Sequence, residues 1–501
     1  MNLHRVLVAN RGEIALRIIR ACHEEGLEAV AVYSDADAES PHVRAADLAV
    51  RIGPAPAAQS YLRSDALLQA ARQSGAQAIH PGYGFLSERA VFADAVERAG
   101  LVFVGPPASA IRAMGDKPEA RRRMAAAGVP LVPGGTAPVK SAKEATLLAE
   151  QLGFPVMVKA AAGGGGKGMR LVARSSELKA ALEAAASEAL RAFGDAGVYL
   201  EKYLERPRHV EIQVLADHLK TIHLGERECS IQRRHQKLLE EAPSVAVSPQ
   251  LRRAMGQAAV AAATAVGYRG AGTCEFLLAR DGSFYFLEMN TRIQVEHPVT
   301  ELVYSVDLVR EQLRIARGLG MAVSEWPLHP RGHALECRIT SEDPANGFLP
   351  STGRISFLRQ PAGPGVRWDA GIEAGNEVTL HYDSLLGKLI VHAEDRPSAI
   401  RRMRRALDEL VLLGVATNIG FLRRLLADPD FAQAEVDIQF LERRLDLLVP
   451  PRDPASELPV VIAAALAEEQ RRAEQKPAVV PAGNGSSAEA WVEAGRLDAL
   501  R

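Results

Sequence analysis

Two glutamates lie in a segment whose strand pairing can be worked out from residue numbers, and together they indicate a metal site. Asp281-Gly282 is a two-residue turn signal between two runs of apolar and aromatic residues. If these residues form the loop, Arg280 pairs with Ser283. The same register places Glu275 opposite Glu288. Like charges directly opposite each other destabilise a sheet, but a hard divalent cation between them removes that cost. Two carboxylates with substrate phosphates are the usual ligands of Mg²⁺.

Further polar residues follow at every second position, namely Asn290, Arg292, Gln294 and Glu296. Because side chains alternate between the two faces of a strand, an extended chain would carry Glu288 and these four on one face. A solvated face of a hairpin is the alternative. The even spacing of acids, amides and a base beside a paired glutamate favours a catalytic or binding site.

A glycine-rich loop, residues 163–168, follows the apolar strand Val156–Ala160, which carries Lys159 near its end. Consecutive glycines let backbone N–H groups converge on an anion without obstruction by side chains. The Walker phosphate loop is excluded, because glycine follows Gly166-Lys167 where that motif requires Ser or Thr. A flexible linker is the alternative. A predicted strand on each side favours a flap that closes over nucleotide phosphates.

These residues need a scaffold, and residues 1–115 alternate short apolar strands with amphipathic helices. A helix is predicted from about Glu13, and strands are predicted at Arg5–Ala9, Ala29–Tyr33, Ala78–His80 and Val102–Gly105. The pattern is typical of a doubly wound α/β domain with a parallel sheet. The turn after the first strand lacks GxGxxG, so a dinucleotide site there is weakly supported.

The pattern changes after Met114, where a helix is predicted from Pro118 to about Ala127. A small unit follows, with helices at 141–152 and 175–191 and strands at 156–160, 169–173 and 198–202. Strands at 208–215 and 220–226 precede a polar loop, a helix at 249–266 and the paired-glutamate hairpin. Beyond about 331 the chain is rich in strands, with helices near 397–412 and 418–426.

The bulk composition limits the class of protein. A chain of 501 residues indicates about three domains. Its net charge of −1 gives no long-range attraction to nucleic acid or to an anionic membrane, and no apolar run approaches the ~18 residues that span a bilayer. Four widely spaced cysteines without a CxxC pair argue against zinc and disulfides. No signal peptide is predicted, so a cytoplasmic location is expected.

Several motifs in one order make the chain resemble the ATP-grasp enzymes, and within them the biotin carboxylases. The resemblance covers residues 1 to about 448. It is carried by HPGYGFLSE at 80–88, MGDK at 114–117, KAAAGGGGKGM at 159–169, EKYLERPRHVEIQ at 201–213, ERECSIQRRHQKLLEEAP at 226–243, EMNTRIQVEHPVTE at 288–301 and HALECRI at 333–339. Pro118 after Lys117 is a minor departure.

The resemblance implies an α/β (α+β) fold in three domains. These are an N-terminal doubly wound domain at 1–115, an ATP-grasp domain at 116–330 with a mobile lid at about 134–203, and a mixed C-terminal domain at 331–448. Residues 449–501 are expected to be a linker and docking tail, partly disordered, with an alanine-rich helix over about 456–475.

The resemblance also implies a set of site residues. ATP phosphates would contact Lys117 and Lys159 beneath Gly164, Gly165 and Gly166. Adenine and ribose would be held by the hinge Glu201, Lys202, Tyr203 and Leu204, with His209, Gln232 and His235. Mg²⁺, or Mn²⁺ in its place, would bind Glu275, Glu288 and Asn290. Bicarbonate would bind Arg292, Lys237 and the backbone of Gln294 and Val295. Tyr83 and Gly84 would line the biotin end.

The implied reaction is ATP-dependent carboxylation of a ureido nitrogen of biotin by bicarbonate, through carboxyphosphate. Glu296 would be the general base that deprotonates bicarbonate, and Arg338 would stabilise the biotin enolate. Because a carboxylate beside an arginine is normally too acidic for a base, partial burial is expected to raise the pKa of Glu296. Taken alone, Arg338 could instead be a strand-edge arginine, and His209 and His235 could be ordinary surface or core histidines.

No biotin-accepting AMKM-like motif occurs, so biotin is expected on a separate biotin carboxyl carrier protein, with carboxyltransferase subunits completing the enzyme. The resemblance implies a homodimer and the first half-reaction of an acetyl-CoA or other acyl-CoA carboxylase, as in fatty acid biosynthesis. A two-subunit pyruvate carboxylase is an alternative.

Two rival functions are a different ATP-grasp carboxylate–amine ligase and a non-catalytic nucleotide-binding subunit. Arg292, Glu296 and Arg338 together argue against the first. The presence of Lys237, Glu296 and both metal glutamates argues against the second.

Overall fold

The computed structural model describes residues 3–135, 138–139, 141–160, 169–193, 195–323 and 329–449, with Ile462, Ala463, Ala465, Leu466 and Glu469 beyond them. Residues Met1–Val449 form one compact unit and Pro450–Arg501 a second. The predicted glycine loop and nearly all of the predicted tail lie outside the described residues.

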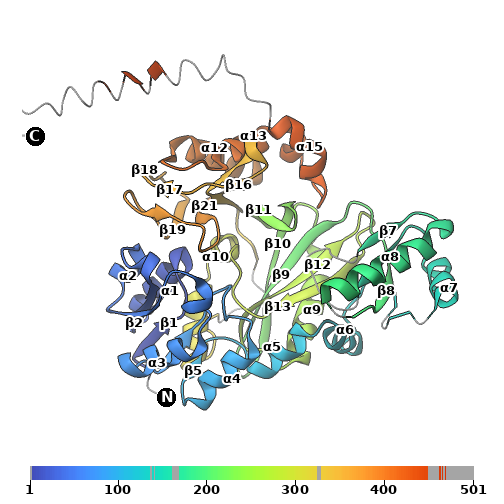
Figure 1. Ribbon diagram of the computed structural model, residues 1–501, viewed down its shortest axis with the longest axis horizontal. Coiled ribbons are helices and arrows are strands. Elements are labelled where there is room, and N and C mark those ends of the chain that lie inside the picture. The colour runs from blue at the N-terminus through green and yellow to red at the C-terminus, as the bar shows by residue number, and fades with distance from the viewer. Residues whose placement is uncertain are drawn as a thin grey trace, which may run out of the picture. The chain divides into compact units, whose positions relative to one another are not determined.

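The N-terminal part is a five-stranded parallel sheet with helices between its strands (Figure 1). The strands β1 Arg5–Val8, β2 Glu28–Ser34, β3 Leu48–Gly53, β4 Ala78–His80 and β5 Val102–Phe103 are ordered β3-β2-β1-β4-β5. The helices are α1 Gly12–Glu24, α2 Pro41–Ala45, α3 Ser64–Ser74, α4 Ala90–Arg98 and α5 Ala108–Gly115. The predicted doubly wound α/β pattern is confirmed. Strand β3 was missed because it lies at the sheet edge, mostly outside the core.

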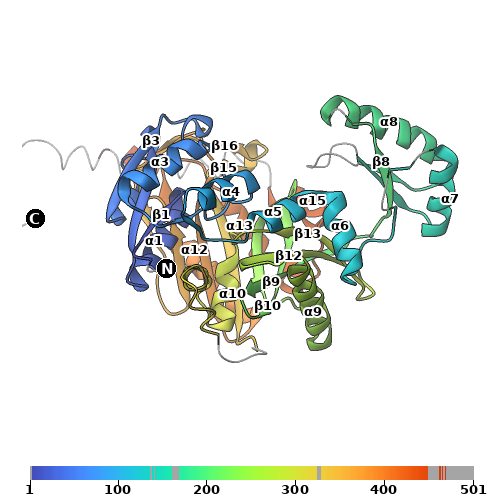
Figure 2. The same ribbon diagram turned by 90° about the horizontal axis from the view of Figure 1, so that it is seen from below.

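A three-stranded antiparallel sheet forms the region of the predicted lid (Figure 2). Its strands β6 Val156–Ala160, β7 Arg170–Val172 and β8 Val198–Lys202 are ordered β7-β6-β8, and α7 Ala142–Leu152 and α8 Ser175–Phe193 pack against them. Helix α7 begins where the side chain of Ser141 accepts a hydrogen bond from Glu144 N. The preceding helix, α6 Lys117–Ala126, matches the predicted one.

The site described below is built on an eight-stranded sheet ordered β13-β12-β9-β10-β11-β14-β21-β19, whose neighbouring strands are antiparallel. Its strands are β9 Arg208–Ala216, β10 Thr221–Arg233, β11 Gln236–Ala242, β12 Gly270–Leu278, β13 Phe284–Asn290, β14 His333–Thr340, β19 Val366–Ala370 and β21 Leu385–Ala393. Helix α9 Pro249–Ala265 packs against it, and α10 His297–Tyr304 and α11 Leu308–Ala316 follow β13.

The predicted polar loop after residue 226 is wrong. Strand β10 continues to Arg233 and turns at Arg234-His235 into β11. Both turn residues have positive φ, 49° and 66°. Glu226, Arg227 and Glu228 of β10 are buried in ion pairs instead of facing water. Their polarity therefore suggested a loop where the chain forms the middle of a sheet.

The remaining elements belong to the strand-rich C-terminal part, as predicted. The helices are α12 Arg396–Glu409, α13 Ile419–Ala427, α14 Pro429–Ala432 and α15 Phe440–Leu448. The short strands are β15 Glu342–Asp343, β16 Leu349–Pro350, β17 Gly353–Arg354, β18 Phe357–Arg359, β20 Glu377–Val378 and β22 Val411–Leu413. Helices α12 and α13 bury their apolar faces with β14 and β21 in one core.

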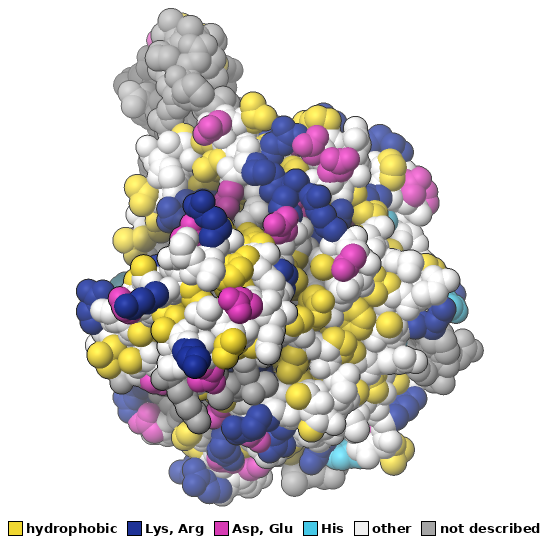
Figure 3. Space-filling view, turned by 90° about the vertical axis from the view of Figure 1, so that its right-hand side faces the viewer, with side chains coloured by type: hydrophobic (Ala, Val, Ile, Leu, Met, Phe, Trp, Pro, Cys, Tyr) yellow, Lys and Arg dark blue, Asp and Glu magenta, His cyan; other side chains and the backbone are white. Residues whose placement is uncertain are grey.

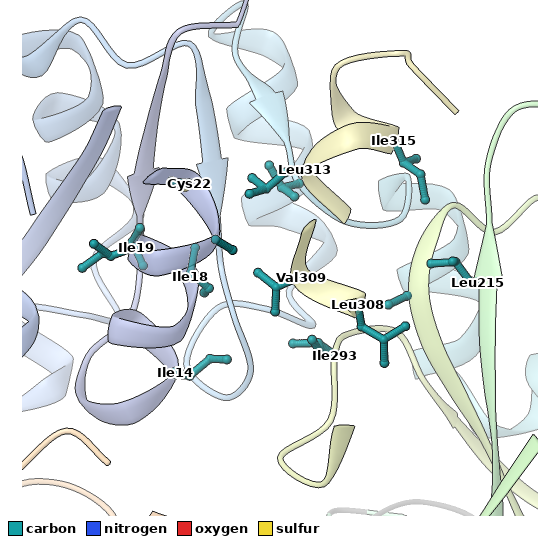
Figure 4. Packing of buried hydrophobic residues seen from close by; sticks show 14 of the residues in the cluster. Ile14, Ile18, Ile19, Cys22, Leu215, Ile293, Leu308, Val309, Leu313 and Ile315 are labelled. Carbon is teal, nitrogen blue, oxygen red and sulfur yellow. The ribbon is translucent and has the colours of Figure 1, made fainter. Parts of the chain in front are cut away.

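One hydrophobic core connects the N-terminal domain to the polar segment after β13 (Figure 4). Ile18 and Cys22 of α1 face Val309 and Leu313 of α11 in this core, which also includes Ile293. Ile293 is fully buried and lies between Arg292 and Gln294. The core therefore holds the backbone on which these two polar side chains are mounted.

Surface and cysteine features agree with the composition. On the face in Figure 3, acidic side chains lie among the basic ones. The four cysteines are buried and free. Of the helices described, none has the length and apolar character needed to cross a bilayer.

Candidate active site

The β12–β13 hairpin does pair Glu275 with Glu288, which confirms the predicted facing carboxylates. The predicted two-residue loop is wrong. Ala279 N donates to Ser283 O over 2.8 Å, so the loop consists of the three residues 280–282. Gly282 has φ 86°, the left-handed conformation that closes a three-residue hairpin loop.

A register shift between the pairs Glu275–Glu288 and Phe276–Phe286 explains why Glu275 still faces Glu288 although the loop has three residues instead of two. Leu287 is the extra residue and is 42% exposed. The longer loop and the bulge each displace the pairing by one residue, in opposite senses. The two displacements cancel at Glu275.

The chain after Asn290 is not one extended strand, contrary to prediction. β13 ends at Asn290, and Glu296 has φ −82° and ψ 12° as the residue before α10. Hydrogen bonds nevertheless hold the side chains of Asn290, Arg292 and Gln294 close to one another and to Glu275. Asn290 Nδ2 and Gln294 Nε2 donate to Glu275 Oε1 over 2.8 and 3.1 Å. Arg292 donates to Asn290 Oδ1 over 3.1 Å and to Gln294 Oε1 over 2.8 Å.

Glu275 is a buried carboxylate with cationic partners. Lys237 Nζ lies 3.0 Å from its Oε1, and His209 Nε2 lies 2.9 Å from its Oε2. Burial opposes ionisation of Glu275, but Lys237 and His209 outweigh it and lower its pKa. The same contact raises the pKa of His209 despite burial. Gln232 Nε2 lies 3.5 Å from His209 Nδ1, so His209 and Gln232 belong to this cluster.

The residues expected to hold a divalent cation fit such an ion. Glu288 is exposed, so its carboxylate is open to a ligand. Desolvation by the surrounding protein and the negative charge of the facing Glu275 raise the pKa of Glu288, and the positive charge of Lys117 opposes this rise. This is the unfavourable pairing of like charges that a cation would relieve. The amide nitrogen of Asn290 faces Glu275, and its amide oxygen accepts a hydrogen bond from Arg292.

Glu296 is completely buried and lies between two cations. Lys237 Nζ is 2.7 Å from its Oε1, and Arg338 Nη2 is 3.0 Å from its Oε2. Burial alone would raise its pKa, but Lys237, Arg338 and Arg227 together lower it well below the usual value. The predicted rise is therefore wrong, because it counted burial and one arginine but not three cations.

Arg338 is an interior residue of the sheet, so the strand-edge alternative is wrong. Strand β14 lies between β11 and β21. Arg338 Nε donates to Glu240 Oε1 over 2.6 Å, and its Nη2 contacts Glu296. Glu240 therefore orients the guanidinium toward Glu296.

Sequence reasoning missed Glu211 and Arg227, which are joined to this cluster by buried ion pairs. The fully buried Arg227 lies 2.5 Å from Glu211, whose other oxygen is 2.6 Å from Lys237 Nζ. His209, Glu211 and Gln213 alternate with apolar residues in β9. That period-two pattern could have identified Glu211, since it places all three side chains on one sheet face.

Two of the residues expected near the phosphates and adenine, Lys159 of β6 and Glu201 of β8, contact each other. Lys159 and Arg121 both pair with the carboxylate of Glu201. Lys202 N donates to Pro133 O and Tyr203 N to Pro155 O. Backbone recognition of adenine in this segment would therefore use carbonyl groups or the N–H of Leu204.

The biotin end was predicted to include Tyr83, whose hydroxyl donates to Glu13. Lys388 Nζ lies 3.1 Å from Glu13 and donates to Val295 O over 2.8 Å. Tyr83 is thereby linked to the segment that carries Glu296. The structure does not bring His235 into the cluster, since it is exposed at the β10–β11 turn. Gly164, Gly165 and Gly166 lie outside the described residues.

Comparisons with known proteins cover nearly the whole first unit. Residues 2–111 match the biotin carboxylase N-terminal domain, residues 116–323 the ATP-binding domain of the carbamoyl-phosphate synthase L chain, and residues 336–443 the biotin carboxylase C-terminal domain. A biotin carboxylase from Nostoc sp. is 54% identical over 88% of this chain and 99% of its own length. A pyruvate carboxylase subunit from Methanothermobacter thermautotrophicus is 51% identical over 87% of this chain and 89% of its own length.

Solved structures are similar over the same region. The biotin carboxylase domain dimer of the Hydrogenobacter thermophilus 2-oxoglutarate carboxylase, in complex with MgADP, ADP and bicarbonate, has a TM-score of 0.82 and 45% identity. The similarity covers 89% of this chain and 98% of that one.

Proposed function

Because this chain belongs to the biotin carboxylase family of ATP-dependent ligases with the ATP-grasp fold, we propose that it carboxylates biotin on a separate carrier protein. The substrates are ATP, bicarbonate and the biotin of that carrier. The observation that carries the proposal is Glu296, a buried carboxylate between Lys237 and Arg338. The similar solved structure that holds MgADP and bicarbonate supports this choice of nucleotide and bicarbonate as substrates.

Glu296 is the proposed base. Its lowered pKa keeps it ionised at neutral pH, so it is ready to accept the bicarbonate proton. Two partly exposed cations provide the surface that attracts the anion: the side chains of Lys237 and Arg292 are 11 and 19% exposed. Arg338, 18% exposed, is assigned to the biotin enolate. A guanidinium matches the planar oxyanion of bicarbonate in two hydrogen bonds.

The nucleotide end uses the residues at the lid and the β12–β13 hairpin. We assign the phosphates to Lys117 and Lys159 and the divalent cation to Glu275, Glu288 and Asn290. When bound, Mg²⁺ neutralises charge on the phosphates during transfer. Residues 116–330 are the proposed ATP-grasp domain, with its lid at about 134–203.

A second proposal concerns the molecule that finally receives the carboxyl group. We assign the chain to an acetyl-CoA or other acyl-CoA carboxylase in the cytoplasm, as a homodimer that works with a carrier protein and carboxyltransferase subunits. Pyruvate is the second candidate acceptor, because a pyruvate carboxylase subunit is 51% identical to this chain.

The test is ATP cleavage by the purified chain with Mg²⁺, with and without bicarbonate and free biotin. Cleavage that requires bicarbonate and rises with biotin is expected. ATP binding without bicarbonate-dependent turnover would contradict the proposal. Reconstitution with carrier and carboxyltransferase, followed by transfer of ¹⁴C from bicarbonate to acetyl-CoA, propionyl-CoA or pyruvate, then separates the acceptors.

A further inference from the structure

Two buried glutamates lie beside Arg338, and neither takes part in a chemical step of the proposed reaction. Glu240 of β11 pairs directly with Glu336 of β14, and Arg338 of β14 pairs with Lys388 of β21. Residues two apart in a strand point the same way. All four side chains therefore leave one face of the sheet, and both glutamates are fully buried.

The hydrogen bonds of this pair are incomplete. Glu240 Oε1 accepts from Arg338 Nε over 2.6 Å. Among the described residues, Glu240 Oε2 and both carboxyl oxygens of Glu336 have no hydrogen-bond donor. Two buried carboxylates in this arrangement would repel each other and leave three oxygens unsatisfied.

The cations near Glu336 are already paired with other carboxylates. Lys388 pairs with Glu13 at 3.1 Å. Arg338 pairs with Glu240 and Glu296. Burial raises the pKa of Glu336 well above its usual value, although Lys388 and Arg338 oppose it, and Glu240 and Glu296 add to the rise. The nearby Tyr83 and Cys229 stay neutral, because burial raises the pKa of each.

We propose that Glu336 is protonated, donates a hydrogen bond to Glu240 Oε2, and thereby positions Arg338 for biotin. One proton satisfies Glu240 Oε2 and one oxygen of Glu336. The pair then shares one proton and one negative charge. Burial raises the pKa of Glu240 to about 7, but Arg338 and Lys237 oppose the rise, which favours the charge on Glu240. Its carboxylate holds Nε and Nη2 of Arg338. Within the described part of the chain, Nη1 of Arg338 has no hydrogen-bond partner, so it is open to a substrate oxygen. The inference rests on the proposed function only for what Arg338 does, since the proton itself is independent of activity.

Infrared spectroscopy of the whole chain at neutral pH tests the proton directly. A protonated carboxyl group has its own carbonyl stretching band, and that band is expected to disappear in the difference spectrum between the protein and Glu336→Gln. Glu97→Gln, an exposed acid in α4, is the matched control and should remove no such band. Absence of the band difference for Glu336→Gln would overturn the proposal, whatever the enzyme's activity.

Kinetics test the positioning. Glutamine can still donate to Glu240, whereas leucine fills the space without donating. Glu336→Leu is expected to lower the ratio of biotin-stimulated to biotin-independent ATP cleavage by about tenfold, the effect of one hydrogen bond. Glu336→Gln is expected to restore most of that loss. Equal ratios in the two variants, with unfolding midpoints matched, would show that Glu336 only fills space.

Discussion

At the scale of single residues, Glu296 shows how neighbours set the acidity of a buried carboxyl group. Burial and nearby cations act in opposite directions, and here Lys237, Arg338 and Arg227 prevail. A base of low pKa accepts a proton weakly, so the same cations must also stabilise the substrate anion. In the proposed reaction Lys237 therefore serves both the base and bicarbonate, and Arg338 serves both the base and the biotin enolate.

Replacing Glu296 by glutamine is expected to remove the base and leave the nucleotide end unchanged. Bicarbonate-dependent ATP cleavage should fall by roughly 10²–10⁴-fold, the usual contribution of general base catalysis. ATP binding, measured by calorimetry, should change little. Because Glu296 stays ionised well below neutral pH, the unaltered enzyme should lose no activity through its protonation between pH 6 and 8. Turnover of Glu296→Gln near the wild-type rate would refute its role as the base.

Glu288→Lys is expected to abolish Mg²⁺-dependent ATP cleavage. The substitution replaces an exposed carboxylate opposite Glu275 by a cation, which repels a metal ion. Asp281→Lys makes the same charge change in the loop of the same hairpin and serves as the control. An active Glu288→Lys enzyme would show that the facing carboxylates do not hold the metal.

At the scale of elements, neighbouring strands of the eight-stranded sheet bury polar residues in its interior. His209 and Glu211 lie on β9, Lys237 on β11, and Arg338 on β14. These strands lie in one sheet, with β10 between β9 and β11 and with β14 beside β11, so acids and bases from distant parts of the sequence become ion pairs. Other ion pairs connect the sheet to a helix.

Glu241 of β11 forms ion pairs of this kind with residues of β14 and α12. Its carboxylate lies 2.7 Å from both His333 Nε2 and Arg396 Nε. Burial would raise the pKa of Glu241, but these hydrogen bonds lower it to about 2. Glu241→Gln is therefore expected to lower the free energy of unfolding at pH 7 by about 3 kcal/mol, since it breaks a buried ion pair.

The same variant should show a defined pH dependence. A carboxyl group with a lower pKa in the folded chain stabilises the fold above the unfolded value of about 4.3. That contribution is lost as the pH falls toward the folded value of about 2. The gap between the urea midpoints of the wild type and Glu241→Gln should thus narrow below about pH 4. A constant gap from pH 7 to pH 3 would mean that the ion pair is not its origin.

At the scale of the whole molecule, residues Met1–Val449 form a compact unit of their own. The Nostoc relative matches 443 residues, which are 99% of its own length but 88% of this chain. The proposed catalytic residues all lie within the first unit. The proposed role of residues 449–501 is to dock the carrier or another component of the carboxylase.

A chain ending at Val449 is expected to retain bicarbonate-dependent ATP cleavage and carboxylation of free biotin within about twofold of the full chain. The reason is that distant, independent sites couple by no more than about 0.5 kcal/mol, which is roughly a factor of two. If the tail docks the carrier, the KM for the carrier protein should rise while the KM for free biotin stays the same. Loss of both activities would place the tail in the catalytic unit. No change in either would remove its docking role.

The sequence by itself determined the family, the N-terminal parallel pattern and most of the helix and strand bounds, because these depend on local periodicity and on motifs in one order. It also determined which residues of the 275–296 segment are polar at period two. The tertiary structure decided the hairpin bulge at Leu287 and the turn of the chain before α10, since both depend on packing against other elements. It alone placed three cations around Glu296 and brought Glu240 beside Glu336. Electrostatic environment is a sum over neighbours in space, and strands far apart in sequence supply most of them.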